Sequence, residues 1–282
     1  MNSADPAPPV PAGRLSGLRK RVFSALVLLA IALAGLFSGP AAFELLVALA
    51  GAILAWEWTR LVGAGRFGLS GLAVGGAVLA SGAVAAAGRP GDALAIAAAG
   101  AVGVYLFARA RGRMQCGWIS AGPIYIGIPV VCLIWLRGED NAGLDAILWL
   151  LASVWATDTG AYFAGRAIGG PKLAPRFSPN KTWAGLFGAM IAAAVVGWIG
   201  SRLVVAGPPA GALAAAGAVL AVVAQGGDLL ESAVKRHFGA KDSSALIPGH
   251  GGLFDRVDGL LTAAVAFALF QWATDARVLT WP

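Results

Sequence analysis

The chain has 282 residues, of which 58% are hydrophobic and only 12% are charged. Soluble globular domains are usually about 25% charged, so this composition excludes a soluble globular protein and indicates a chain whose solvent is the bilayer. The net charge of +7 does not by itself indicate nucleic acid, because basic residues in a membrane protein also set topology and bind anionic lipids or substrates.

Apolar runs of helix length recur along almost the whole chain. Residues 1–13, rich in Pro and Ala, are expected to form a disordered cytoplasmic tail, and residues 14–282 a single transmembrane catalytic domain. The first run, Val22 to Phe37, resembles a signal peptide, but we interpret it as an uncleaved span because further long runs follow it. Eight more spans are predicted near 41–58, 67–87, 92–108, 117–136, 144–165, 184–205, 210–230 and 259–274.

The distribution of basic residues predicts the orientation of these nine spans. If the N-terminus is inside, all but four of the 21 Lys and Arg residues lie in inside segments. The exceptions are Arg89, Arg137, Arg202 and Arg277. Cytoplasmic loops carry the excess of positive charge. We therefore predict an all-α polytopic integral membrane protein of about nine transmembrane helices, with a cytoplasmic N-terminus, in the inner (cytoplasmic) membrane.

Two of the predicted inside loops, 166–183 and 231–258, are long and polar, which is typical of segments that carry function. The second loop follows a span whose end places four polar side chains on one helical face, at positions i, i+3, i+4 and i+7. These are Asp228, Glu231, Ser232 and Lys235. Carboxylates at membrane depth need a partner or a metal, so a salt-bridged helix end and a metal–phosphate site both stay open.

A second pair of carboxylates, Asp255 and Asp258, lies one helical turn apart on either side of Arg256. Carboxylate oxygens suit a hard cation such as Mg²⁺, and neighbouring Lys and Arg suit phosphate oxygens. Carboxylates for a metal together with cations for phosphate are typical of phosphoryl-type transfer.

The segment from Ser232 to Asp258, called here the signature segment, resembles the signature of phosphatidate cytidylyltransferases, also called CDP-diacylglycerol synthases. The matching residues are Ser232, Lys235, Arg236, Lys241, Asp242, Pro248, His250, Gly251, Gly252, Asp255, Arg256 and Asp258. Residues 158–162 and 178–183 resemble two other motifs of the family. The chain departs from the family pattern at Ala184, where glutamate is frequent, and at Ser244, where glycine is usual.

The resemblance implies transfer of a cytidylyl group from CTP to phosphatidic acid, with Mg²⁺ and a second cation such as K⁺. It implies catalytic roles for Asp228, Asp255, Lys235, Lys241 and His250. Asp228 and Asp255 are the expected principal metal ligands, with Asp258, Glu231 and Asp158 next. Substrate contacts are expected from Asp158, Ser178, Asn180, Lys181, Thr182, Ser232, Arg236, Asp242 and Arg256.

Several alternatives stay open. His250 is either an acid for the departing pyrophosphate or a turn residue between glycines. An ion-coupled transporter could use Glu44, Glu57 and Asp158 as an intramembrane path, although no inverted repeat is evident. A lipid or polyprenol kinase would also need Mg²⁺ and a nucleotide, and differs in which phosphorus is attacked. Beyond the two substrates and membrane lipid we expect no nucleic acid, and a homodimer stays open.

Overall fold

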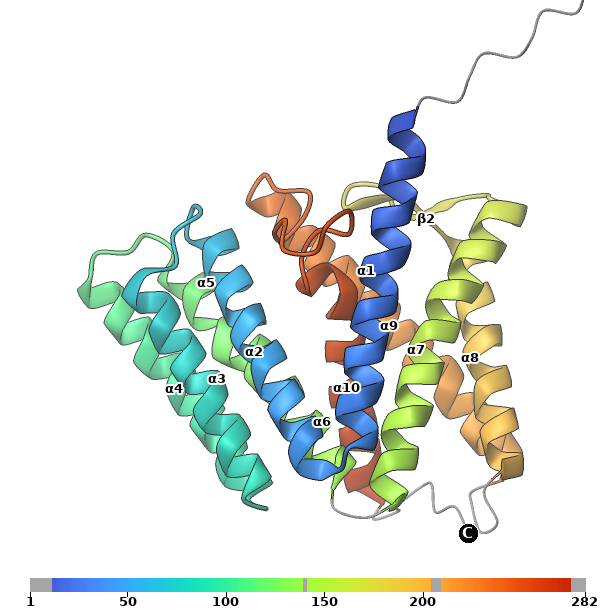
Figure 1. Ribbon diagram of the computed structural model, residues 1–282, viewed down its shortest axis with the longest axis horizontal. Helices are drawn as coiled ribbons and strands as arrows, with labels where there is room; N and C mark the ends of the chain where they lie inside the picture. The colour runs from blue at the N-terminus through green and yellow to red at the C-terminus, as the bar shows by residue number, and fades with distance from the viewer. Residues whose placement is uncertain (1–11, 139–140, 204–208, 275–282) are drawn as a thin grey trace, which may run out of the picture.

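The computed structural model describes residues 12–138, 141–203 and 209–274, which form a helical bundle (Figure 1). Residues 1–11 of the expected tail and the outside residue Arg277 lie beyond the described part. Residues 12 and 13 already belong to the first helix.

Between residues 12 and 138 the structure contains helices only. They are α1 (Ala12–Phe37), α2 (Pro40–Val62), α3 (Gly68–Ala86), α4 (Pro90–Ala110), α5 (Cys116–Ser120), the π-helical turn η1 (Pro123–Gly127) and α6 (Ile128–Arg137). Pro40 and Pro90 each begin a helix, a position where the missing N–H of proline costs no hydrogen bond. The last three elements together occupy the apolar run predicted near 117–136.

The described residues from 141 onwards contain four long helices and one short hairpin. These elements are α7 (Asn141–Ile168), β1 (Lys172–Ala174), β2 (Ser178–Thr182), α8 (Trp183–Leu203), α9 (Ala210–His237) and α10 (Phe254–Thr274). The antiparallel hairpin β1–β2 was not predicted. Helices α9 and α10 both extend into the loop expected over 231–258, which shortens it to residues 238–253 and places most of the polar motif residues on helices.

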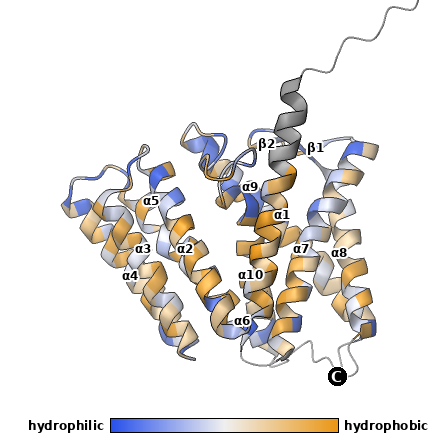
Figure 2. Ribbon diagram, in the orientation of Figure 1, coloured by the Kyte–Doolittle hydropathy of each residue, from blue (hydrophilic) through white to orange (hydrophobic). Residues whose placement is uncertain are grey.

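The helices have the length and composition of an all-α membrane protein. Among the described residues, six helical segments are long and apolar enough to span a membrane, namely Pro40–Val62, Gly68–Ala86, Pro90–Ala110, Cys116–Arg137, Trp183–Leu203 and Ala210–His237. Figure 2 shows apolar residues through the middle of the bundle and hydrophilic residues gathered towards its ends. The shorter apolar run of α1, Val22–Phe37, overlaps the first predicted span.

The motif-bearing segments meet at one end of the bundle. In Figure 1 the hairpin, the loop between α9 and α10, and the start of α1 all lie at the top, together with the α2–α3 and α4–α5 connections. A large apolar core that includes Leu54, Leu150, Leu220 and Phe267 holds the helices below them. The bundle therefore presents the polar segments at one end of an apolar scaffold.

Candidate active site

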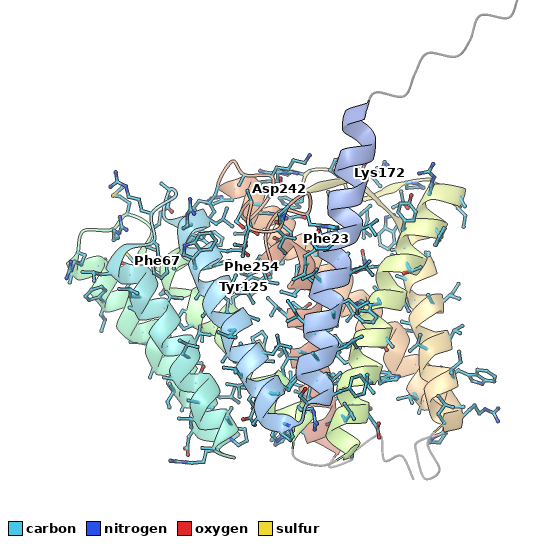
Figure 3. The ribbon with its side chains drawn as sticks, in the orientation of Figure 1. Phe23, Phe67, Tyr125, Lys172, Asp242 and Phe254 are labelled. Atoms are coloured by element: carbon cyan, nitrogen blue, oxygen red, sulfur yellow. The ribbon has the colours of Figure 1, made fainter. Side chains whose placement is uncertain are left out.

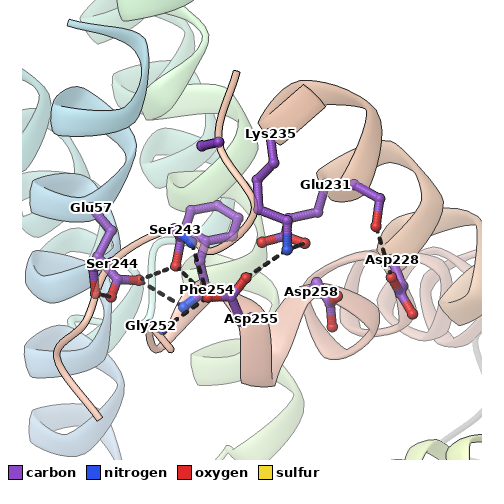
Figure 4. Close-up of polar contacts among 12 residues, drawn as sticks. Glu57, Asp228, Glu231, Lys235, Ser243, Ser244, Gly252, Phe254, Asp255 and Asp258 are labelled. Carbon is purple, nitrogen blue, oxygen red and sulfur yellow. Dashed lines mark hydrogen bonds and ion pairs between the residues drawn. The ribbon is translucent and has the colours of Figure 1, made fainter. Parts of the chain in front are cut away.

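Three carboxylates form the centre of this end of the bundle. Asp228 and Glu231 project from the last turns of α9, and Asp258 projects from the first turns of α10 (Figure 4). One oxygen from each lies within 4.8 Å of the others. We call these residues the carboxylate triad.

The triad has the properties of a site for a divalent cation. Glu231 is buried, and its Oε1 atom accepts no hydrogen bond from any residue that the structure describes. Its Oε2 atom lies 2.6 Å from Lys235 Nζ as an ion pair. Asp258 accepts a hydrogen bond of 2.8 Å from the backbone N–H of Gly259. Three clustered carboxylates repel one another unless cations compensate them, and the Oε1 atom of Glu231 that accepts no hydrogen bond could bind one, so these residues fit Mg²⁺.

The hairpin places a lysine side chain beside the triad. Lys181 on β2 places its Nζ atom 2.6 Å from Asp228 Oδ2 and donates to the carbonyl of Gln225 at 3.3 Å. Ser232 donates to Asp228 Oδ1 at 3.3 Å. The structure therefore brings Lys181, which is 47 residues away in sequence, to the carboxylate that was the first choice as a metal ligand.

Asp255 stands apart from the triad, although it was expected to share a metal with Asp228. Its Oδ1 atom accepts a hydrogen bond of 2.5 Å from Lys235 Nζ. Its Oδ2 atom accepts from Ser243 N at 2.9 Å, Ser243 Oγ at 2.9 Å and Gly252 N at 2.8 Å. Among the described residues, Asp258 and not Asp255 clusters with Asp228. The contacts of Asp255 join the loop between α9 and α10 to the start of α10, and its expected role as a metal ligand stays a prediction.

Lys235 forms buried ion pairs with carboxylates of both α9 and α10. Its side chain is 11% exposed, and its Nζ atom lies 2.6 Å from Glu231 and 2.5 Å from Asp255. Removing a partner from a buried ion pair leaves an uncompensated charge. Lys235 therefore joins the two helices at the site as well as supplying a positive charge near it.

A polar cavity of about 530 Å³ lies in the loop between α9 and α10. Its lining residues are Lys241, Asp242, Ser244, Ala245, Ile247, Gly249, His250, Gly251 and Arg256. Figure 3 shows Asp242 at this end of the molecule. The Nδ1 atom of His250 lies 2.8 Å from the hydroxyl of Ser24 on α1. Gly251 has φ +84°, a conformation that favours glycine, and closes the turn that carries the histidine.

The other predicted residues lie around these two features. Asp158 on α7 interacts electrostatically with Asp228, Lys181 and Arg256, but it is not one of the three clustered carboxylates. Thr182 accepts a hydrogen bond of 3.1 Å from Gly185 N, so its hydroxyl supports the start of α8. Exposed or partly exposed positions are taken by Ser178, Asn180 and Arg236, and Arg236 donates to Ala240 O at 3.0 Å.

Sequence reasoning missed the role of Glu57. The sequence named Glu57 only in the alternative of an ion-coupled transporter. The structure buries Glu57 completely and directs hydrogen bonds to it from Ser243, Ser244, Leu253 and Phe254. A carboxylate within an apolar span signals that a partner exists, but the sequence does not name that partner.

Comparisons with known proteins agree with the resemblance of the signature segment. The profile of the Cytidylyltransferase family matches residues 19–273. A phosphatidate cytidylyltransferase of Brucella suis is 42% identical over 256 residues, which cover 91% of this chain and 94% of that protein. One of Pseudomonas aeruginosa is 37% identical over 267 residues, which cover 91% and 97%. One of Bacillus subtilis is 41% identical over 147 residues, which cover 52% and 55%. The chain belongs to the Cytidylyltransferase family.

Proposed function

We propose that this protein transfers the cytidylyl group of CTP to phosphatidic acid and releases pyrophosphate, giving CDP-diacylglycerol for phospholipid biosynthesis. The observation that carries the proposal is the carboxylate triad beside Lys181, at the polar end of an apolar helical bundle. The names of the relatives, phosphatidate cytidylyltransferase, support the choice of both substrates.

The reaction needs little acid–base chemistry from the protein. A phosphate oxygen of phosphatidic acid attacks the α-phosphorus of CTP, and the bond from that phosphorus to the oxygen bridging to the β-phosphate breaks. Pyrophosphate departs with the electron pair. Because the lipid phosphate is already anionic at neutral pH, the task is to bring two polyanions together and to stabilise the charge on the leaving group.

The site divides this task between two groups of residues. Asp228, Glu231 and Asp258 would hold Mg²⁺, which when bound neutralises phosphate charge, and a second cation such as K⁺ is part of the same proposal. Lys241 and Arg256, in the wall of the polar cavity, would bind nucleotide phosphates.

The lipid must keep its acyl chains in the bilayer while its headgroup reaches the triad. An apolar hollow of about 340 Å³ lies between η1, α9 and α10. Tyr125, Val223, Leu261, Thr262 and Val265 are among its lining residues. Thr262, which lines this hollow, follows Asp258 of the triad by one helical turn, so the hollow suits an acyl chain whose headgroup reaches the triad.

We further propose nine membrane spans with a cytoplasmic N-terminus in the inner membrane. Support comes from the distribution of Lys and Arg, most of which belong to the predicted inside segments. Of these segments, the α2–α3 and α4–α5 connections, the hairpin and the signature segment lie at one end of the bundle (Figure 1). This orientation makes the site accessible to CTP from the cytoplasm.

The direct test uses the purified protein in detergent with CTP, phosphatidic acid and Mg²⁺. We expect CDP-diacylglycerol and pyrophosphate to form in equal amounts, and both to disappear when EDTA removes the metal. Release of CDP with a phosphorylated lipid would instead indicate a kinase, and absence of any lipid product would contradict the proposal.

A further inference from the structure

Glu57 is a completely buried carboxylate on α2 that lies outside the carboxylate triad. Its side chain ends against the signature segment, up to 197 residues later in the chain. A buried charge of this kind is costly unless hydrogen bonds compensate it. The residues that provide these bonds show which part of the molecule Glu57 holds.

Glu57 caps the first turn of α10 from another helix. Its Oε1 atom accepts from Ser244 Oγ at 2.6 Å and from Leu253 N at 2.9 Å. Its Oε2 atom accepts from Phe254 N at 2.7 Å and from Ser243 Oγ at 3.4 Å. The first N–H groups of a helix have no acceptor within it, and a carboxylate there also interacts favourably with the helix dipole.

This cap connects to the triad through a continuous line of polar contacts (Figure 4). Ser243 Oγ also donates to Asp255 at 2.9 Å. Asp255 in turn accepts from Lys235 at 2.5 Å, and Lys235 lies 2.6 Å from Glu231 of the triad. Asp258, another triad residue, follows Asp255 by one turn on the same capped helix.

Packing at the same place fixes α10 against α2. Phe254 is buried and stacks on Tyr125 with ring centroids 5.5 Å apart, as their neighbouring positions in Figure 3 illustrate. It also lies 6.0 Å from the ring of Trp58, the residue after Glu57. At Gly252 a Cβ atom would collide with Ser243 Oγ and Glu57 Oε1, so the close approach of the loop to Glu57 requires glycine.

We propose that Glu57 is a positioning residue of the active site. By capping α10 it holds Asp258 where that carboxylate shares a divalent cation with Asp228 and Glu231. The inference rests on the proposed function, because it concerns the same metal-dependent site. In this chain Ser244, at a position where the family usually has glycine, adds a further donor to the cap.

The test compares Glu57→Gln with Glu44→Gln, the same substitution nearer the other end of α2. The amide introduced by Glu57→Gln keeps the shape of the side chain, but its NH₂ group cannot accept a hydrogen bond, so a backbone N–H of α10 loses its acceptor. Two quantities are measured on detergent-purified protein: Mn²⁺ affinity by electron paramagnetic resonance, and kcat for CDP-diacylglycerol formation. We expect Glu57→Gln to weaken Mn²⁺ binding and to lower kcat by about 10- to 100-fold each. Glu44→Gln should change neither.

Two further variants keep the test decisive if Glu57→Gln does not fold. Glu57→Asp retains the charge but shortens the side chain, and should retain part of both quantities. Ser244→Gly removes one donor and should lower both by roughly threefold. The positioning role would be overturned if all of the folded Glu57 and Ser244 variants kept wild-type Mn²⁺ affinity and kcat. It would also be overturned if these variants lowered the unfolding temperature without changing either quantity. Wild-type protein that binds Mn²⁺ but forms no CDP-diacylglycerol would instead contradict the proposed function.

Discussion

Asp258 is the triad residue that depends most on a bound cation. Lys181 and Lys235 already compensate Asp228 and Glu231 at 2.6 Å each. Asp258 is left with two carboxylates beside it and a backbone hydrogen bond. At short separation such charges are not stable together without a metal or a proton.

We predict that Asp258→Asn lowers cytidylyl transfer by about 100-fold or more at ordinary Mg²⁺ concentrations. The double variant with Asp228→Asn should be scarcely slower than either single variant, because ligands of one cation act as a unit. Product formation over a Mg²⁺ titration measures both effects. Asp92→Asn is the matched control, since Asp92 on α4 forms an exposed ion pair with Arg89, the residue that precedes this helix. Near-normal turnover of Asp258→Asn would remove it from the metal site.

Lys235 offers a prediction about stability. Lys235→Met should lower the free energy of unfolding by about 3–5 kcal/mol, because Glu231 and Asp255 would remain buried without their cation. Thermal unfolding in detergent measures this effect. Lys241→Met changes an exposed cation of the polar cavity, and should leave the unfolding temperature unchanged while raising KM for CTP. Equal unfolding temperatures for both variants would contradict the bridging role.

Helical periodicity predicted which polar residues of α9 lie together at the site. The spacing of Asp228, Glu231, Ser232 and Lys235 placed them on one face of a helix, as the contacts within α9 show. Periodicity says nothing about partners on other helices. It therefore could not distinguish Asp255 from Asp258 as the neighbour of Asp228, and it gave no partner for Glu57.

At the scale of the elements, the apolar runs predicted where the helices lie but not where they end. Helix α9 continues to His237 because its buried face includes Glu231 and Lys235. Hydropathy alone ends the predicted span before these residues, because both are charged. The hairpin was missed because β1 and β2 have three and five residues, too few and too polar for an alternating pattern. Its contribution is nevertheless direct, since it carries Lys181 to Asp228.

The hairpin contains two lysines, Lys181 and Lys172, that can be compared as test and control. Lys181→Met should lower cytidylyl transfer by about tenfold or more, because it removes the charge beside Asp228. Lys172→Met makes the same change at an exposed position of β1, opposite Thr182, and should leave activity near the wild-type value. Initial rates with both substrates saturating provide the comparison, and equal losses in the two variants would argue against a specific role for Lys181.

At the scale of the whole molecule, the nine-span arrangement predicts that the chain ends lie on opposite sides of the membrane. A reporter that works only outside the cytoplasm should be active when fused after Pro282. The same reporter inserted in the loop 238–253 should be silent, because that loop belongs to the cytoplasmic end. A reporter that works only inside the cytoplasm should give the complementary pattern. A cytoplasmic C-terminus would exclude nine spans with the N-terminus inside.

In the proposed reaction the α-phosphorus of CTP, and not the γ-phosphorus, is transferred to the lipid. The most direct measurement incubates the purified protein with phosphatidic acid and Mg²⁺ in two parallel reactions, one with CTP labelled at the α-phosphorus and one with CTP labelled at the γ-phosphorus. After lipid extraction, we predict label in the organic phase only from α-labelled CTP, with the γ label recovered as aqueous pyrophosphate. Lipid labelled by γ-labelled CTP, or by neither nucleotide, would contradict cytidylyl transfer by this protein.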